Sequence, residues 1–135
     1  MTKDLTLSFH VAARTVTGSC MEFCHAGKRI LVDCGMLQGS RELAEQNAEE
    51  FGFDARSIDV VLLTHAHLDH CGRLPLLAKR GFQGEIVATP ATQELARLVM
   101  LDAAHLQEEE ARRASLHTRR RGATAPIEPL YSVPD

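Results

Sequence analysis

The sequence has few aromatic residues and no long apolar run. Phe, Tyr and Trp together make up 4% of the 135 residues, so the core must consist mostly of Leu, Val, Ile and Ala. No segment reaches the roughly 18 apolar residues of a membrane-spanning helix, and the N-terminus lacks the apolar stretch of a signal peptide. We therefore expect a cytoplasmic protein with no membrane contact.

Paired cysteines and a strong excess of charge are also missing. The four cysteines, at positions 20, 24, 34 and 71, form no CxxC pair, which favours reduced thiols. A formal net charge of −3 argues against binding of nucleic acid by bulk positive charge, so any such contact would be local. With 44% apolar residues, the chain is long enough to bury the core of one compact domain.

Several apolar segments predict β-strands. Residues 5–9 alternate between apolar and polar side chains, which is typical of a half-buried strand. Residues 20–24 and 28–33 flank the turn His25-Ala26-Gly27 and predict a hairpin. Residues 58–64 form a nearly continuous β-branched run, which indicates a strand buried on both faces, and residues 85–88 predict a further short strand.

Three segments carry helix signals. Residues 40–51 contain helix-forming residues with a weak apolar stripe and predict a short surface helix, and residues 73–80 predict a second helix that Gly81 ends. Thr89 and Pro90 supply an N-cap and a first-position proline for a long helix to about Arg113. Arginines and prolines follow, which predict a solvated helix end and an extended linker, with a phosphate-contacting arm as the alternative.

The segment Thr64–His70 brings four potential metal ligands together at the end of the buried strand. His65 and His67 are two residues apart and point the same way in an extended backbone, so they can chelate one ion. Asp69 and His70 follow after a bend and suit a second ion nearby. Imidazole and carboxylate ligands favour Zn²⁺, with Mn²⁺ or Fe²⁺ as alternatives. The spacing therefore predicts a two-metal site.

Asp33 is the next candidate for a role in this site. It ends the strand that contains Ile30, Leu31 and Val32, and it precedes Cys34-Gly35. A carboxylate at a strand end can accept a hydrogen bond from a ligating imidazole and fix its tautomer, although an Asp before Gly also forms ordinary turns. The isolated histidines are more typical of solvated or structural positions; they are His10, His25, His105 and His117.

These motifs resemble those of the metallo-β-lactamase superfamily, and within it the β-CASP group of RNA-processing nucleases. Thr64–His70 matches the motif HxHxDH, and Leu31–Gly35 matches the first motif, which ends in an aspartate. The finer resemblance rests on three further segments, TVTGS at 15–19, DCGMLQG at 33–39 and GRLPLL at 72–77, and on the region 81–92. The resemblance extends from about Leu5 to Tyr131.

The resemblance implies an α/β fold, the N-terminal half of an αββα sandwich, with a mixed sheet and flanking helices. Residues 1–113 would form this partial domain, and residues 114–135 would form a linker containing Arg and Pro. His65 and His67 would hold one zinc ion, Asp69 and His70 would hold a second, and Asp33 would support the ligands from behind. Asp69 would also act catalytically by orienting the water that attacks a phosphodiester of single-stranded RNA.

The family's third and fourth motifs have no counterpart in these residues. We therefore expect the chain to be the N-terminal segment of an endo- or exonuclease, incomplete by itself and weakly active or inactive. An exposed sheet edge or face would favour homo-oligomers. Two alternatives stay open, namely another hydrolase of this fold that acts on a thioester or lactone, and a catalytically silent fragment.

Overall fold

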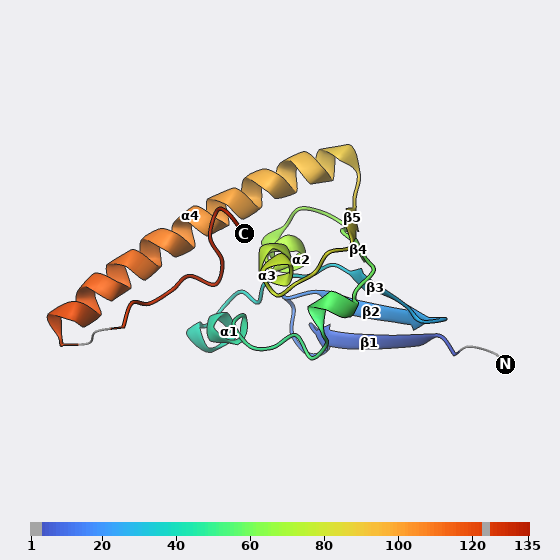
Figure 1. Cartoon of the computed structure of the whole chain (residues 1–135), viewed down its shortest axis with the longest axis horizontal. Helices are drawn as coiled ribbons and strands as arrows, with labels where there is room; N and C mark the ends of the chain where they lie inside the picture. The colour runs from blue at the N-terminus through green and yellow to red at the C-terminus, as the bar shows by residue number, and fades with distance from the viewer. Residues whose placement is uncertain (1–3, 123–124) are drawn as a thin grey trace.

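A computed structural model describes residues 4–122 and 125–135 as a mixed α/β structure. Five strands form one sheet, and helices lie beside it (Figure 1). The strands are β1 (Thr6–Val11), β2 (Cys20–His25), β3 (Lys28–Val32), β4 (Val60–Leu62) and β5 (Glu85–Val87). The helices are α1 (Arg41–Gln46), the 3₁₀ turn η1 (Ala55–Ser57), α2 (Leu68–Cys71), α3 (Leu74–Lys79) and α4 (Pro90–Arg120). The expected mixed sheet with flanking helices is confirmed.

The hairpin of β2 and β3 forms where the sequence predicts it. Ala26 and Gly27 both have positive φ angles, 54° and 80°. Two successive residues with positive φ give a turn that matches the right-handed twist of the flanking strands. The pairing places Phe23 opposite Ile30 in an antiparallel register.

The sheet has the order β1-β2-β3-β4-β5, so each strand lies beside its neighbour in sequence. β1, β2 and β3 pair in antiparallel fashion, whereas β3, β4 and β5 run parallel. Val32, at the end of β3, is opposite Leu62, at the end of β4. Parallel strands end at the same edge of the sheet. Asp33, which follows β3, therefore lies beside the segment Thr64–His70 after β4, here termed the histidine segment.

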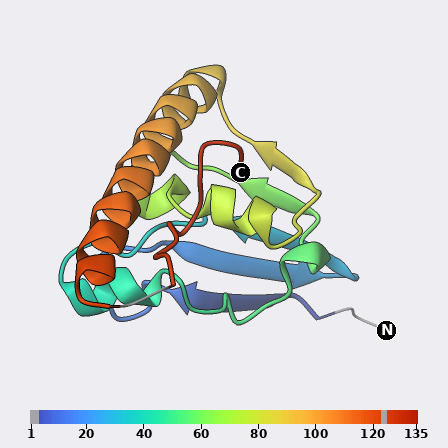
Figure 2. The same ribbon diagram turned by 60° about the vertical axis from the view of Figure 1, so that its left-hand side comes forward.

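The two faces of the sheet differ in what covers them. Leu31 and Val61 are fully buried on the face toward the helices, where α2 and α3 lie between the sheet and α4 (Figure 2). The opposite face, here termed the open face, carries Glu85 and nine apolar side chains: Leu7, Phe9, Met21, Phe23, Ile30, Val32, Val60, Leu62 and Val87.

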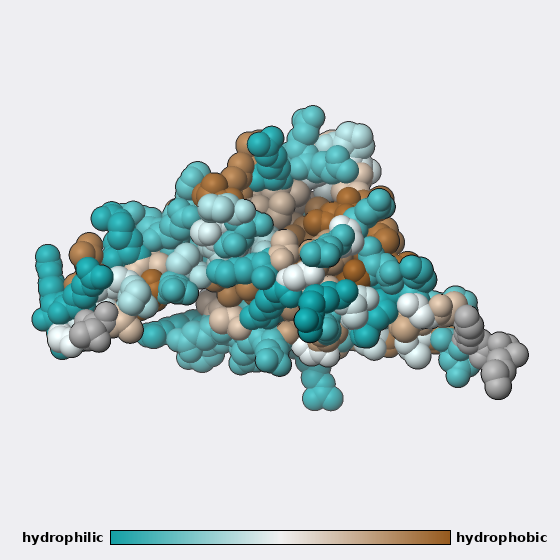
Figure 3. Space-filling model, in the orientation of Figure 1, coloured by the Kyte–Doolittle hydropathy of each residue, from teal (hydrophilic) through white to brown (hydrophobic). Residues whose placement is uncertain are grey.

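Several side chains of the open face are accessible to solvent. Phe9 is 55% exposed, Val87 48% and Leu62 40%. Figure 3 shows a hydrophobic patch on the side of the molecule where β4 and β5 lie. An apolar face that crosses all five strands is what one sheet of a β-sandwich presents to the other.

Three secondary-structure predictions, two of helices and one of a strand, need correction. α1 begins after its N-cap Ser40 but ends at Gln46 rather than Phe51, because its weak apolar stripe buries no residue. The expected seven-residue strand over 58–64 is only β4, since pairing with β3 and β5 spans Val60–Leu62 alone.

The third correction concerns the long helix, which continues to Arg120 instead of ending near Arg113. Ser115 Oγ accepts a hydrogen bond of 2.8 Å from the backbone N–H of Ile127, so the returning C-terminal segment lies against this part of α4 (Figure 1). The helix stops just before Gly122, which has a φ of 90° and supplies the left-handed residue that commonly ends helices. Among the described helices, none has the length and hydropathy needed to cross a membrane.

Candidate metal centre

The histidine segment connects β4 to α3 and brings three imidazole rings together. The ring of His65 lies 3.9 Å from that of His70 and 4.8 Å from that of His67, between centroids. His65 and His67 are in the extended part of the segment, whereas Asp69 and His70 are in α2. The bend expected between the two pairs of ligands is therefore a helix start, with His67 as its N-cap residue.

Asp33 lies behind these rings and is buried. Its backbone has a φ of 63°, in the left-handed region that Asp tolerates better than most residues, and this directs the chain sharply away from β3. Asp33 Oδ2 is 2.7 Å from His70 Nδ1, and Oδ1 accepts a hydrogen bond of 2.8 Å from the Thr64 N–H. One carboxylate thus joins the end of β3 to both ends of the histidine segment.

Backbone hydrogen bonds fix three of the four carbonyl groups of α2, those of Leu68, Asp69 and His70. The N–H of Cys34 donates to the oxygen of His70 (2.9 Å), and the N–H of Met36 donates to that of Leu68 (2.9 Å). The N–H of Ser19 donates to the oxygen of Asp69 (2.8 Å). These residues come from the loop before β2 and from the segment after β3, so the segment is held from two sides.

Gly35 and Arg73 complete this support. A Cβ atom at position 35 would lie 1.7 Å from the backbone oxygen of Asp69, so only glycine allows the close approach. Arg73 is 2% exposed, and its Nε donates a hydrogen bond of 2.7 Å to the oxygen of Gly35. Its guanidinium also lies over the ring of Phe51, 5.0 Å from the centroid. A cation–π contact with Phe51 therefore helps to hold Arg73, and through it Gly35, in place.

Three buried thiols, those of Cys20, Cys34 and Cys71, belong to the segments that hold the histidine segment in place. Burial raises the pKa of the Cys71 thiol to about 11, so this side chain is neutral at physiological pH. A hydrogen bond between the thiols of Cys20 and Cys34 lowers the pKa of Cys20 and raises that of Cys34. All four cysteines are free, as the sequence predicts.

The imidazole and carboxylate groups of the site are donors that suit a divalent metal ion, but there are too few of them around any one point. Among the described residues, no group of three or more His, Cys, Asp or Glu side chains is arranged around one point that could hold an ion. His70 Nε2 and Asp69 Oδ2 are 3.5 Å apart, and about a quarter of each side chain is exposed. A cavity of about 230 Å³ adjoins the rings of His65 and His67 and extends to Thr92 and Leu95 of α4.

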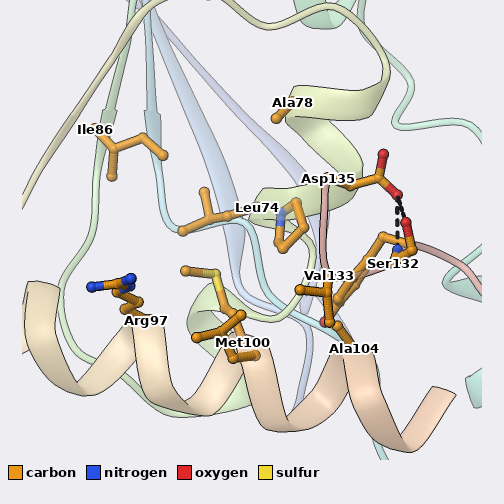
Figure 4. A pocket seen from close by; sticks show the side chains of 12 residues that line it. Leu74, Ala78, Ile86, Arg97, Met100, Ala104, Ser132, Val133 and Asp135 are labelled. Carbon is orange, nitrogen blue, oxygen red and sulfur yellow. Dashed lines mark hydrogen bonds between the residues drawn. The ribbon is translucent and has the colours of Figure 1, made fainter. Parts of the chain in front are cut away.

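A second cavity, of about 250 Å³, lies between α3, β5, α4 and the C-terminal segment (Figure 4). Leu74, Ile86, Met100 and Val133 are among its mainly apolar lining residues. None of the candidate ligands lines it. We therefore assign the chemistry to the histidine segment and regard this cavity as a packing feature.

Sequence reasoning assigned no role to three residues of the site, namely Thr64, Gly35 and Arg73. Gly35 could have been suspected from its place directly after Asp33-Cys34, but no sequence pattern shows that Arg73 is buried. The isolated histidines lie elsewhere: His10 contacts Glu22 at 2.7 Å, whereas His25, His105 and His117 are exposed.

Known proteins are similar to this chain over most of its length. Residues 13–130 match the family model described as the metallo-beta-lactamase superfamily. The chain is similar to Ribonuclease TTHA0252 of Thermus thermophilus, with 50% identity over 98 residues, 73% of this chain and 22% of that protein. It is also similar to the Transcription termination factor FttA of Methanocaldococcus jannaschii, with 32% identity over 108 residues, 80% of this chain and 17% of that protein.

Among solved structures, the chain is similar to BJP-1, a subclass B3 metallo-beta-lactamase of Bradyrhizobium japonicum. The TM-score is 0.45 at 22% identity, over 98% of this chain and 43% of that one. The chain spans about a fifth of the length of the two curated relatives.

Proposed function

The chain belongs to the metallo-β-lactamase superfamily, and on that premise we propose that it supplies the metal-binding loop of a zinc-dependent ribonuclease. The observation that carries the proposal is the convergence of His65, His67 and His70 beside one buried carboxylate. Protonated imidazoles this close together would repel each other, whereas neutral imidazoles are the commonest metal ligands in proteins.

The substrate is inferred from the relatives. The name of the Thermus thermophilus protein identifies a ribonuclease, and half of the 98 aligned residues are identical. The motifs of this chain also resemble those of the β-CASP group of RNA-processing nucleases, which supports the same substrate. Phosphodiester bonds of single-stranded RNA are therefore the substrate we propose for the whole protein.

The roles within the site follow from the positions of the donors. His65 and His67 would hold one zinc ion, and Asp69 and His70 the other, so each ion takes two donors from this chain. When bound, the two ions supply the positive charge that acidifies water and neutralises phosphate oxygens. A catalytic zinc site usually has three protein ligands, so each ion needs a further donor.

Asp69 has a second role in this proposal. Its carboxylate is partly exposed, unlike that of Asp33, and so can contact substrate water. An oxygen of Asp69 would accept a hydrogen bond from the attacking water and keep its lone pair directed at phosphorus. Asp33 has no access to substrate, and its part is to hold the imidazole of His70.

Zinc binding tests the proposal most directly. Equilibrium dialysis followed by metal analysis should find zinc on the wild-type chain, and a chromophoric chelator should compete for it. We expect His67→Ala to lower the zinc affinity at least about tenfold, because half of one donor pair is lost. The matched control is His105→Ala, an exposed histidine of α4, which should bind zinc as the wild type does.

Cleavage assays with labelled single-stranded RNA then address the reaction. We expect slow, zinc-dependent cleavage that His67→Ala abolishes and His105→Ala retains. Absence of zinc binding by the wild type would contradict the proposal. Hydrolysis of a thioester or lactone in place of RNA would assign the chain to another branch of the superfamily.

A further inference from the structure

The hydroxyl group of Thr64 lies between the buried carboxylate and the first histidine. Thr64 Oγ1 is 3.0 Å from Asp33 Oδ1 and 2.9 Å from Asp33 Oδ2. The same oxygen is 3.0 Å from His65 Nδ1. Thr64 is thus in contact with Asp33 through its side chain as well as through its backbone N–H.

Counting protons determines the direction of these hydrogen bonds. A threonine hydroxyl has one proton to donate, whereas an ionised carboxylate can only accept. The Thr64 proton therefore goes to Asp33, and the Thr64 oxygen is left to accept the proton on His65 Nδ1. In a neutral imidazole with a proton on Nδ1, the lone pair is on Nε2.

His70 also donates a hydrogen bond from its Nδ1, but directly to Asp33 and without a hydroxyl group in between. Its Nδ1 is 2.7 Å from Asp33 Oδ2 and must donate, which leaves Nε2 with the lone pair. By contrast, the ring of His67 forms no hydrogen bond with any residue in the described ranges. Asp33 therefore reaches one histidine of each pair, directly for His70 and through a hydroxyl for His65.

We propose that Thr64 is a positioning residue, which relays the carboxylate of Asp33 to His65 and fixes that histidine as its Nδ1–H tautomer with Nε2 free for a metal. The inference rests on the proposed function in that it assigns the free Nε2 to a metal. The relay itself is a property of the metal-free protein. It makes the two pairs of ligands depend on one buried carboxylate.

Loss of the hydroxyl should release His65. Thr64 is exposed, so water would replace the hydroxyl beside Nδ1 and would accept or donate equally well. The ring could then rotate or move its proton to Nε2, which removes the lone pair. Loss of a hydrogen-bond partner behind a ligating histidine typically lowers metal affinity by about 10- to 100-fold.

NMR of the metal-free protein labelled with ¹⁵N-histidine tests the relay without any catalysis. Long-range ¹H–¹⁵N spectra at a pH where the rings are neutral distinguish the two tautomers, and the spectrum of His65→Gln identifies the signals of His65. We expect the Nδ1–H tautomer for His65 in the wild type and in Thr64→Ser. In Thr64→Val, which keeps the shape of threonine, we expect a mixture or the Nε2–H tautomer, with His70 unchanged.

Zinc affinity by chelator competition gives the second measurement. Thr64→Val should bind about 10- to 100-fold more weakly than Thr64→Ser. Thr118→Val, which removes a hydroxyl from α4 far along the chain, should bind as the wild type does. An Nε2–H tautomer in the wild type would overturn the relay, and this measurement needs only His65→Gln for assignment, so it does not depend on the folding of Thr64→Val. Equal tautomers and equal affinities in Thr64→Val and Thr64→Ser would also overturn it.

The relay and the proposed function fail in different ways. If the wild type binds no zinc but Thr64→Val still changes the His65 tautomer, the relay stands and the metal assignment is wrong. If the wild type binds zinc and the tautomer of His65 does not respond to Thr64→Val, the metal assignment stands and the relay is wrong.

Discussion

The sheet edge that supports the histidines and the far end of α4 contain the same residue types in opposite surroundings. The sheet region has Gly35, Arg73 and Glu22, all packed or buried. The helix end has Gly122, Arg113 and Glu109, with open space or solvent around them. Both arginines donate hydrogen bonds and both glutamates accept them. The comparison teaches that the number of groups around a side chain, more than its type, sets the cost of replacing it.

The pair of glycines should give the largest difference. In Gly35→Ala the new Cβ would clash with the backbone oxygen of Asp69, and neither backbone can move without breaking hydrogen bonds of the site. We expect a loss of more than about 4 kcal/mol in the free energy of unfolding, or failure to fold. In Gly122→Ala nothing lies within 4 Å, and only the φ of 90° is unfavourable, which costs about 1 kcal/mol.

Urea denaturation followed by circular dichroism measures both variants. A Gly35→Ala protein as stable as Gly122→Ala would show that the strand end and α2 are not in the close contact described. Zinc titration of any folded Gly35→Ala protein would then show whether the histidine segment had moved.

The pair of arginines should give an intermediate difference. Arg73→Ala removes a buried hydrogen bond to Gly35 and the contact with Phe51, and it leaves a cavity, so we expect a loss of about 3 kcal/mol. Arg113 pairs with Glu109 at 2.8 Å, but its side chain is 74% exposed. Arg113→Ala should therefore change stability by no more than about 0.5 kcal/mol.

A third variant separates the packing of Arg73 from its charge. Arg73 Nη2 is buried and has no hydrogen-bond partner among the described residues, so the guanidinium is not fully satisfied. Arg73→Met keeps most of the aliphatic stem and should lose less stability than Arg73→Ala. If both variants lose equal amounts, the guanidinium group carries the whole effect, through its hydrogen bond to Gly35 and its contact with Phe51.

The pair of glutamates should differ least, and only in acid. Burial raises the pKa of Glu22, but hydrogen bonds from Arg29 and His10 outweigh it and hold the pKa below the usual 4.5. A lowered pKa contributes stability above the unfolded value, and that stability is lost as pH falls through the folded value. We expect the melting temperature of the wild type to decrease as the pH drops below about 4.5. The melting temperature of Glu22→Gln should decrease less over the same pH range.

Glu109→Gln is the control for this acid effect. Hydrogen bonds from Arg112 and Arg113 lower the pKa of Glu109, but the carboxylate is exposed to solvent and screened by salt. The melting curves of Glu109→Gln from pH 3 to 7 should therefore follow those of the wild type. If Glu22→Gln also follows the wild type, then the ion pairs of Glu22 add nothing to stability.

Local signals in the sequence were sufficient for much of the fold. The hairpin could be predicted because the short turn between two apolar segments contains Gly27, which accepts a positive φ. The site loop could be predicted because histidines two apart on a strand end share a direction. The length of β4 could not be predicted, since it depends on how far β3 and β5 extend beside it. The end of α4 was also missed, because Ser115 is held by Ile127 from a distant part of the sequence.

The site shows the same division between local and distant information. The ligand candidates and Asp33 could be selected from spacing and position, and the structure brings His65, His67 and His70 together beside the buried carboxylate of Asp33. The position of Gly35 after Asp33-Cys34 gave a hint of its role, but neither its contact with the oxygen of Asp69 nor the burial of Arg73 could be predicted, since no sequence pattern reveals them. The left-handed backbone of Asp33 is likewise a product of the two segments that meet there.

The order of the strands has a consequence for how the chain folds during synthesis. Because each strand pairs with its neighbour in sequence, the sheet can grow one strand at a time, with a modest loop to close at each step. Within residues 4–122 and 125–135, the hydrogen bonds that hold the histidine segment join residues between Ser19 and Arg73. These contacts can therefore form on the ribosome while α4 is still being made, so that the ligands are positioned before the long helix packs over them.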